Sequence, residues 1–309
     1  MPLDKMLLIV KPSDNSTLVN RFREIRNYLN YHGCEFDIAF TEYSKHAWKL
    51  ANENADKYGT IVSVGGDGTL NEVVNGVMFS KNPRVSIGVL PLGSGNDYLR
   101  NFGIMNHLQA LEMLLPGEIQ NVDVGCAEFC DDITGESHAR YYCNLASVGL
   151  GAKVARNADK YFKRFGGTLG YLLSFLLTVV EEQPFEMKIK ADSLTTHGRR
   201  FWEVQANIGV YVAGGMKATP HSNMYDGLLG TLVVHQMKKV ELLKTFPKIY
   251  TGKHLSHPKV DHFNAGRVEI TAHNLEVNLD GELAGKTPVV LSVLPKSLSL
   301  RIKEFETRH

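Results

Sequence analysis

The chain has 309 residues, 43% of them hydrophobic, which is enough to bury a large core and to form two domains. Its 34 basic and 33 acidic residues give a net charge of +1, which excludes a global electrostatic case for nucleic-acid binding. The four cysteines form no zinc-ligand pattern, so we expect reduced thiols in a cytoplasmic protein. We expect no signal peptide, and the longest apolar run, residues 169–180, is shorter than the roughly 20 residues that span a bilayer.

Strand and helix patterns alternate through the first 125 residues. Apolar, β-branched runs predict strands at 6–10, 35–40, 60–64, 85–90 and 119–124. Between them, the sequence predicts helices at 18–31, 45–58, 70–79 and 107–115. This alternation is typical of a mostly parallel sheet with helices on both faces, whose ligands bind beyond the carboxyl ends of the strands. We therefore predict an α/β nucleotide-binding domain over residues 1–125.

From about residue 126 the pattern changes to strand-like runs punctuated by turn residues. These runs lie at 141–148, 185–190, 201–210, 228–235, 266–271, 275–279 and 288–292. We predict a β-rich, largely antiparallel domain over residues 126–297, with a helical insertion near 153–180. The C-terminal segment 298–309 could return as a strand to the sheet of the first domain.

The segment GGDGTLNE, residues 65–72, directly follows a predicted buried strand and precedes a predicted helix. Glycines let backbone N–H groups approach phosphate oxygens, and the helix N-terminus favours negative charge there. Asp67 would repel a phosphate unless a cation lies between them, so the loop indicates phosphate together with Mg²⁺. The dinucleotide fingerprint fails because Asn71 stands where its last glycine belongs. The Walker motif fails because Ser94 follows Gly93 where a lysine is required, and the protein-kinase motifs are absent.

A second glycine-rich loop, residues 91–97, follows the next predicted strand. Ser94 offers a hydroxyl to phosphate, and Asp97 offers a second carboxylate. The alternative for this segment is an ordinary turn with an Asx cap. Because both loops follow strands of one parallel sheet, we expect them to lie together and to form one site.

Several segments together resemble the catalytic domain of the bacterial diacylglycerol kinase family, which includes sphingosine and ceramide kinases. The matching segments are 65–72, 93–97, 123–125, 144–149, 214–216 with Pro220, 226–229 and 280–282. The resemblance implies a first domain like those of NAD kinase and phosphofructokinase. It also implies an ATP- and Mg²⁺-dependent kinase that phosphorylates a lipid hydroxyl, with diacylglycerol as the default acceptor.

The resemblance assigns site residues one by one. Those implied to bind ATP are Thr41, Gly65, Gly66, Asp67, Gly68, Thr69, Asn71, Glu72, Ser94 and Asp97. Asp67, Asp97 and Asp123 match acidic groups that work through Mg²⁺ and ordered water. A structural Mg²⁺ site is implied at Asp226 with the backbones of Asn223 and Leu228. The chain departs from the family where an Asn-Pro and a nearby glycine are usual, because Lys11 and Pro12 occupy that place.

Asp280 and Glu282 match the family's Asp-Gly-Glu motif, which is implicated in deprotonating the lipid hydroxyl. Phosphoryl transfer needs a group that accepts this proton, and a carboxylate can do so. If strand geometry continues through Gly281, both side chains point to one face. The alternative is an Asp-Gly hairpin turn. We favour Glu282 as the base, supported by Asp280, although the sequence does not decide between them.

Residues 153–165 predict a basic amphipathic helix, with Lys153, Arg156, Lys160, Lys163 and Arg164 in one arc. Such a helix could rest on an anionic membrane surface, which would place the protein peripherally at the inner membrane face. The alternative is a solvated basic face over a packed core. The expected partner is a lipid substrate at the membrane surface and not a nucleic acid, with a homodimer as one option for the assembly. Two other functions stay open: an NAD kinase-like enzyme and a non-catalytic nucleotide-binding regulator.

Overall fold

The computed structural model describes residues 5–93, 95–130, 137–162, 167–192, 194–196 and 199–303. The chain divides into two compact units: unit 1 contains Met1–Val122 and Lys296–His309, and unit 2 contains Asp123–Pro295. Two long strands, β5 (Glu118–Cys130) and β18 (Val289–Ile302), contribute residues to both units. In the described ranges, no helix is long and apolar enough to cross a membrane.

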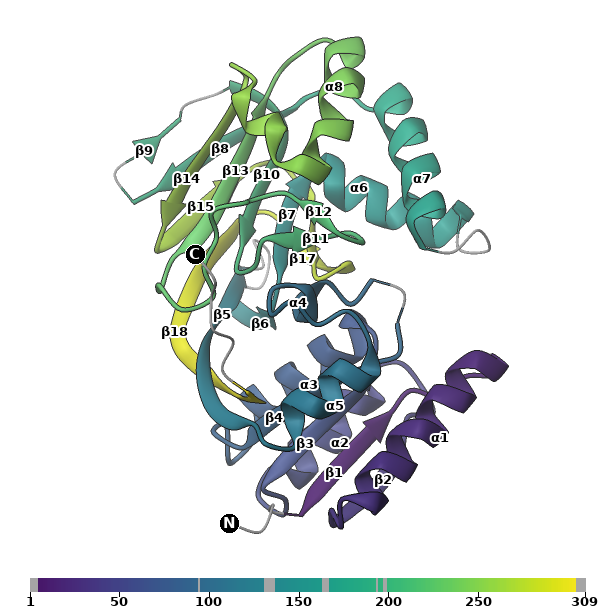
Figure 1. Ribbon diagram of the computed structural model, residues 1–309. Coiled ribbons are helices and arrows are strands. Elements are labelled where there is room, and N and C mark those ends of the chain that lie inside the picture. Colours follow the sequence, from purple (N-terminus) through teal and green to yellow (C-terminus); the bar gives the residue numbers. More distant parts are fainter. Residues whose placement is uncertain are drawn as a thin grey trace. The chain divides into compact units, whose positions relative to one another are not determined.

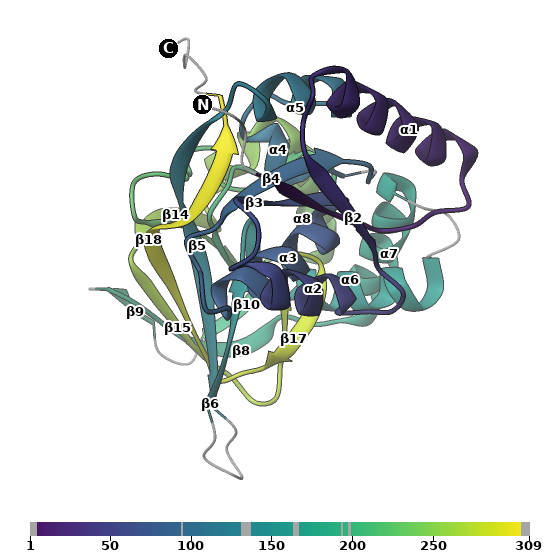
Figure 2. The ribbon, with the colours of Figure 1, turned by 90° about the horizontal axis from the view of Figure 1, so that it is seen from below.

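Unit 1 is a parallel sheet with helices on both faces. Its strands follow the order β2-β1-β3-β4, and Leu300 of β18 pairs in parallel with Ile87 of β4. Figures 1 and 2 show α1 and α5 on one face of the sheet and α2 and α3 on the other. The elements are β1 (Met6–Val10), α1 (Ser16–Tyr31), β2 (Phe36–Phe40), α2 (His46–Asn54), β3 (Thr60–Gly65), α3 (Asp67–Met78), β4 (Ser86–Pro91), α4 (Asp97–Arg100) and α5 (His107–Leu114).

Unit 2 is built on antiparallel strands, with helices packed along one side. β10 lies centrally, because it pairs with β7, β8 and β13. The strands are β6 (Ser137–Tyr142), β7 (Leu145–Gly149), β8 (Phe185–Ala191), β9 (Leu194–Thr195), β10 (Arg199–Asn207), β11 (Tyr211–Val212), β12 (Met216–Lys217), β13 (Leu229–His235), β14 (Val260–Ala265), β15 (Arg267–Thr271), β16 (Glu276–Leu279) and β17 (Glu282–Lys286). The helical segments are α6 (Leu150–Asn157), η1 (Ala158–Phe162), α7 (Gly167–Glu181), α8 (Lys239–Thr245), η3 (Phe246–Thr251) and η4 (Lys253–Ser256). The predicted fold class, an α/β domain followed by an antiparallel β-rich domain, is confirmed.

One prediction for the helices of unit 2 is wrong, and one helical stretch was not predicted. The basic segment 153–165 is not one α-helix, because α6 ends at Asn157 and a π-helical turn, η1, follows it. A π-turn holds more residues than an α-turn, so the predicted arc of basic side chains does not continue through it. The sequence analysis also missed the helical stretch α8, η3 and η4, in which Pro247 and Gly252 interrupt the helical pattern.

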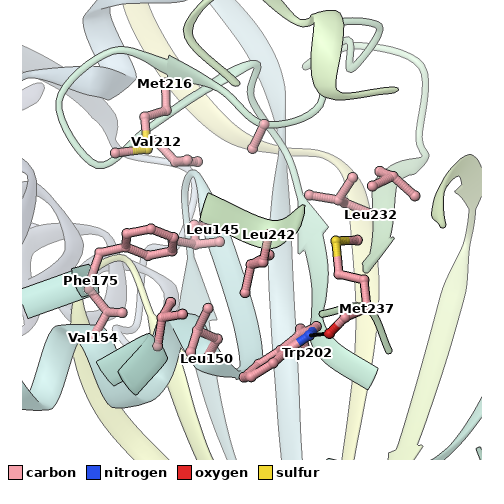
Figure 3. Close-up of a cluster of buried hydrophobic side chains, with 13 residues drawn as sticks. Leu145, Leu150, Val154, Phe175, Trp202, Val212, Met216, Leu232, Met237 and Leu242 are labelled. Atoms are coloured by element: carbon pink, nitrogen blue, oxygen red, sulfur yellow. Dashed lines mark hydrogen bonds between the residues drawn. The ribbon is translucent and has the colours of Figure 1, made fainter. Parts of the chain in front are cut away.

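The helices of unit 2 cover an apolar core that Figure 3 shows in close-up. Phe175 of α7 and Leu242 of α8 point toward the same interior, beside Leu150 of α6. Trp202 of β10 is 1% exposed and donates its indole N–H to the carbonyl of Met237 at 3.0 Å. A buried aromatic side chain whose polar atom is also satisfied fixes the packing of strand against helix.

Candidate functional site

The two glycine loops of unit 1 lie against each other, as predicted. β3 and β4 are neighbouring parallel strands, with Gly65 opposite Pro91. The N–H groups of Leu92 and Gly93 donate to the carbonyl of Gly65, at 2.8 and 3.2 Å. A Cβ on Gly93 would lie 2.6 Å from the Gly66 Cα, so the backbones approach more closely than any side chain would allow.

The first loop leads directly into helix α3, whose N-cap is Gly66. An α-helix leaves its first N–H groups without acceptors inside the helix, and here these belong to Asp67, Gly68 and Thr69. Gly66 supplies no side-chain cap for them. The positive end of α3 therefore presents backbone donors that suit an anion such as a phosphate.

Asp67 joins the two loops. Its Oδ2 accepts a hydrogen bond from the Asp97 N–H and its Oδ1 accepts one from the Tyr98 N–H, both at 3.2 Å. These donors belong to the first turn of α4, which begins at Asp97. Asp97 itself is 6% exposed, and its Oδ1 lies 3.4 Å from the Arg100 Nε. The structure thus brings together two of the acidic residues predicted for Mg²⁺ binding.

The other residues predicted for ATP binding have different surroundings. The side chain of Thr69 packs against Gly65, and a Cβ added to Gly65 would clash with the Thr69 Oγ1. Asn71 is buried inside α3 and Thr41 follows β2. Glu72 accepts hydrogen bonds from the N–H groups that begin α2, so it caps that helix. Ser94 lies outside the described residues.

A cavity of about 450 Å³ opens beside the two loops in unit 1. Gly65, Gly66 and Gly93 line one wall, and Lys11 with the following residues lines another. The third wall is apolar, since Phe22 and Phe40 meet there edge to face at 5.9 Å. A cavity with an aromatic wall beside backbone donors suits a molecule that carries both a planar ring and a phosphate chain.

The predicted structural metal site lies in unit 2, on the loop before β13. Asp226 and Asn223 are exposed, and each accepts a hydrogen bond from the N–H two residues ahead. Asp123 of β5 is 1% exposed and accepts a hydrogen bond from the Gly227 N–H at 2.7 Å, which ties the loop to the strand. Within the described ranges, no three His, Cys, Asp or Glu side chains cluster closely enough to hold a metal ion. The Asp226 carboxylate and the Asn223 and Leu228 carbonyls are nevertheless oxygen donors of the type that Mg²⁺ prefers.

Asp280 and Gly281 form a tight turn between β16 and β17. Both have positive φ, at 50° and 96°, so strand geometry does not continue through Gly281 and the alternative of an Asp-Gly hairpin turn describes this segment. The Asp280 carboxylate accepts three backbone hydrogen bonds, from Cys143 at 2.7 Å and from Asn144 and Leu145 at 2.9 Å each. These three hydrogen bonds engage both carboxylate oxygens of Asp280 and fix the turn to the segment before β7.

Glu282, the first residue of β17, lies in a different environment. Its side chain is 43% exposed, and the guanidinium of Arg140 lies 3.8 Å from its Oε2. The side chain of Arg140 is only 13% exposed, so the cation approaches Glu282 from the protein side. The Glu282 carboxylate is therefore accessible from solvent, whereas the Asp280 carboxylate is engaged by three backbone amides.

Comparisons with known proteins agree with this arrangement of motifs. A family model for the diacylglycerol kinase catalytic domain matches residues 5–127. A model for the YegS C-terminal NAD kinase beta sandwich-like domain matches residues 144–302. A diacylglycerol kinase from Staphylococcus aureus strain JH9 is 30% identical over 237 residues, covering 75% of this chain and 71% of the relative.

The chain belongs to the diacylglycerol kinase family. A solved structure of a candidate diacylglycerol kinase from Bacillus anthracis is 25% identical, with a TM-score of 0.77 and 97% of each chain covered. An NAD kinase from Archaeoglobus fulgidus, solved with ATP, is 12% identical with a TM-score of 0.51, and covers 98% of this chain and 95% of its own. That second likeness shows a shared fold.

In this member of the diacylglycerol kinase family, unit 2 contains an apolar cavity of about 90 Å³. Its walls are side chains of the core shown in Figure 3, among them Leu150, Phe175 and Leu242. One wall is polar, because Ser147 of β7 with Glu203 and Gln205 of β10 line the cavity. An apolar cavity with a few polar groups is typical of a site for a small amphipathic ligand.

Glu203 is the residue of this site that the sequence analysis missed. It is 6% exposed; its Oε2 accepts from the Gly151 N–H at 2.7 Å and its Oε1 from the Gln205 amide at 3.1 Å. Burial raises the pKa of Glu203 from 4.5 to about 8, so the side chain holds a proton at neutral pH. The available signal is the alternation of Glu203, Gln205 and Asn207, which places three polar side chains on one face of the strand among the apolar residues of 201–206.

Proposed function

We propose that the protein is an ATP- and Mg²⁺-dependent lipid kinase that transfers the γ-phosphate of ATP to a hydroxyl of diacylglycerol or a related lipid. The observation that carries the proposal is the pair of glycine loops at the start of α3, beside the cavity of unit 1. Family membership supports the kinase activity. The identity of the acceptor rests on the apolar cavity of unit 2.

The cavity of unit 1 offers one surface for the adenine ring of ATP and another for its phosphates. Phe22 and Phe40 offer an apolar wall to the adenine ring, and the backbones at Gly66 and Gly93 offer close approach to the phosphates. Lys11 adds a positive charge to the cavity wall. Bound Mg²⁺ would neutralise charge on the phosphates, and the carboxylates of Asp67 and Asp97 are the oxygen donors in these loops that would hold it.

Glu282 is the proposed base. It accepts the proton of the acceptor hydroxyl while that oxygen bonds to the γ-phosphorus, and the bond from the γ-phosphorus to the ADP oxygen breaks. Asp280 is proposed as a positioning residue, because its three backbone hydrogen bonds fix the turn that carries Glu282. Arg140 lies 3.8 Å from the Glu282 Oε2 and can hold the carboxylate in place for the incoming hydroxyl.

The apolar lining of the unit 2 cavity supports a lipid acceptor over a dinucleotide. Most of its lining is aliphatic or aromatic, which suits an acyl chain and offers few partners to the ribose and phosphate groups of NAD. The polar wall at Glu203 and Ser147 would face the glycerol part of the lipid. We therefore favour a lipid over NAD as the acceptor, and place the enzyme in the cytoplasm at the inner membrane face.

An acceptor assay tests the proposal. The protein is incubated with Mg²⁺ and γ-labelled ATP, together with either diacylglycerol vesicles or NAD, and the labelled product is identified. We expect label in phosphatidic acid, with no transfer after the Mg²⁺ is chelated. Label in NADP would establish the NAD kinase alternative, and no transfer to either acceptor or to a total lipid extract would establish the non-catalytic alternative.

A further inference from the structure

Helix α7 of unit 2 presents a row of exposed aliphatic side chains to solvent. Leu169, Leu172, Leu176 and Val180 are 55, 41, 43 and 70% exposed. At 100° per residue they fall within an arc of about 80°, and they extend over about 17 Å of helix. We call these four residues the α7 stripe. No charged residue interrupts the helix between Gly167 and Val180.

The other face of α7 belongs to the apolar interior. Phe175 and Val179 are 4 and 0% exposed and pack into the core of Figure 3, and Tyr171 and Phe175 line the cavity of unit 2. Ser174 and Thr178 on this face are also buried, and both make hydrogen bonds to residues of α6. Since α7 is buried on one side only, its stripe leaves a large apolar face in water, which is the signature of an interaction site.

Both ends of the stripe carry further apolar and basic groups. At the N-terminal end, Tyr161 is 50% exposed and lies under the Lys160 ammonium, which is 4.7 Å from the ring centroid. At the C-terminal end, Lys239 donates to the carbonyl of Val180 at 2.6 Å, and the next residue, Val240, is 63% exposed. Lysines and an aromatic ring beside aliphatic side chains are the groups that settle at the interface of an anionic bilayer.

The basic residues of the predicted helix 153–165 are less available for binding anionic lipid than the sequence indicated. Lys153 and Arg156 both pair with Glu276, at 3.4 and 3.1 Å. Lys163 and Arg164 lie outside the described residues. The acidic residues nearby in sequence are Asp159, Glu181 and Glu182. Electrostatic attraction from this segment is therefore modest, and the apolar stripe has to supply most of the binding.

We propose that the α7 stripe docks unit 2 onto the surface of an anionic lipid bilayer, with the helix lying in the interface plane. At about 17 Å, the stripe is too short to cross a bilayer, whereas an amphipathic helix of this length can embed its apolar face at the headgroup boundary. The inference extends the proposed function, because one face of α7 meets the bilayer while the other lines the cavity assigned to the acyl chain.

The test compares vesicle binding by the full-length protein and two double variants. Leu172→Gln/Leu176→Gln removes apolar surface from the stripe without adding charge. The matched control, Leu108→Gln/Ile119→Gln, changes two similarly exposed aliphatic residues of unit 1, at 47 and 53%. Each protein is sedimented, without nucleotide, with vesicles of phosphatidylcholine and phosphatidylglycerol. We expect the stripe variant to lose about tenfold or more in partition coefficient, and the control to stay within about twofold.

A second measurement separates docking from catalysis. The proteins are assayed with diacylglycerol in vesicles and with a short-chain diacylglycerol dispersed as monomers. We expect the stripe variant to lose activity on vesicles only. Equal vesicle binding by the wild-type protein and the stripe variant overturns the docking inference, whatever the kinase assay shows. Stripe-dependent vesicle binding without phosphorylation of either acceptor supports docking and refutes the proposed function. A wild-type dimer that the stripe substitutions dissociate, with vesicle binding unchanged, assigns the surface to a second copy of the chain instead.

Discussion

Replacing the buried carboxyl of Glu203 should change how the stability of unit 2 depends on pH. The group is 6% exposed in the central strand β10, and it accepts hydrogen bonds from the Gly151 N–H and the Gln205 amide. Burial raises the pKa of Glu203 from 4.5 to about 8. The folded protein therefore binds a proton at this site that the unfolded chain releases between pH 4.5 and 8.

This difference in proton binding means that the contribution of Glu203 to stability decreases as the pH rises. Because the folded pKa of Glu203 is the higher one, its contribution to stability is fully present below pH 4.5 and is lost as the pH rises to about 8. The interval between 4.5 and about 8, at 1.36 kcal/mol per pKa unit, sets an upper bound of about 5 kcal/mol on this change. Glu203→Gln keeps the size and a hydrogen-bonding amide but does not titrate, so its stability lacks this pH dependence.

Urea unfolding at a series of pH values measures the effect. Trp202, which is 1% exposed and adjacent to Glu203, reports the unfolding of unit 2 when the other tryptophan is removed by Trp48→Phe. We expect the free energy of unfolding of the parent, minus that of Glu203→Gln, to fall by several kcal/mol between pH 5 and 8 and to be flat above pH 8. Parallel pH profiles for the two proteins would refute the protonated, buried carboxyl.

Three further predictions concern the site. Glu282→Gln should lower kcat by about 10²–10⁴-fold in the labelled-ATP assay without changing Tm, and undiminished turnover would exclude Glu282 as the base. Asp280→Ala removes the acceptor of three backbone hydrogen bonds, so urea unfolding should show a loss of about 3 kcal/mol or more; an unchanged midpoint would contradict the anchoring role. Gly93→Ala places a Cβ 2.6 Å from the Gly66 Cα, so we expect about 1–3 kcal/mol of destabilisation with an increased KM for ATP, and a normal KM would place the phosphates elsewhere.

The sequence predicted unit 1 well because its signals are local. Apolar, β-branched runs fix the buried strands, and a glycine loop at the end of a parallel strand has a known place in the fold. The contact between the loops at Gly66 and Gly93 follows from the adjacency of β3 and β4. Unit 2 was predicted more coarsely, since Pro247 and Gly252 obscure the helical stretch that follows β13.

Long-range hydrogen bonds explain most of what the sequence could not predict. The three amides that bind Asp280 come from residues 135–137 positions earlier in the chain, so the Asp-Gly pair alone predicts only a turn. Glu203 is similar, because its alternation with Gln205 and Asn207 is typical of a solvent-exposed face of a strand. The start of α6 contacts this face, where the Gly151 N–H donates to the Glu203 carboxylate, and residues 52 positions apart carry no such signal in the sequence.

Several carboxylates in the motifs shared with the family accept hydrogen bonds from backbone N–H groups and so hold loops of the protein in place. Asp67 holds the start of α4, Glu72 holds the start of α2, and Asp280 holds the segment before β7. Loss of activity after an alanine substitution at such a residue therefore does not establish a role in chemistry, because the substitution also releases a loop of the site. Glu282 begins β17 with a side chain that is 43% exposed, so a Glu282→Gln variant with unchanged Tm and lowered kcat would report proton transfer at this carboxylate. An Asp67→Asn variant that keeps Tm but loses Mg²⁺-dependent turnover would separate the two roles at Asp67, because asparagine retains one acceptor oxygen and loses the charge that a cation requires.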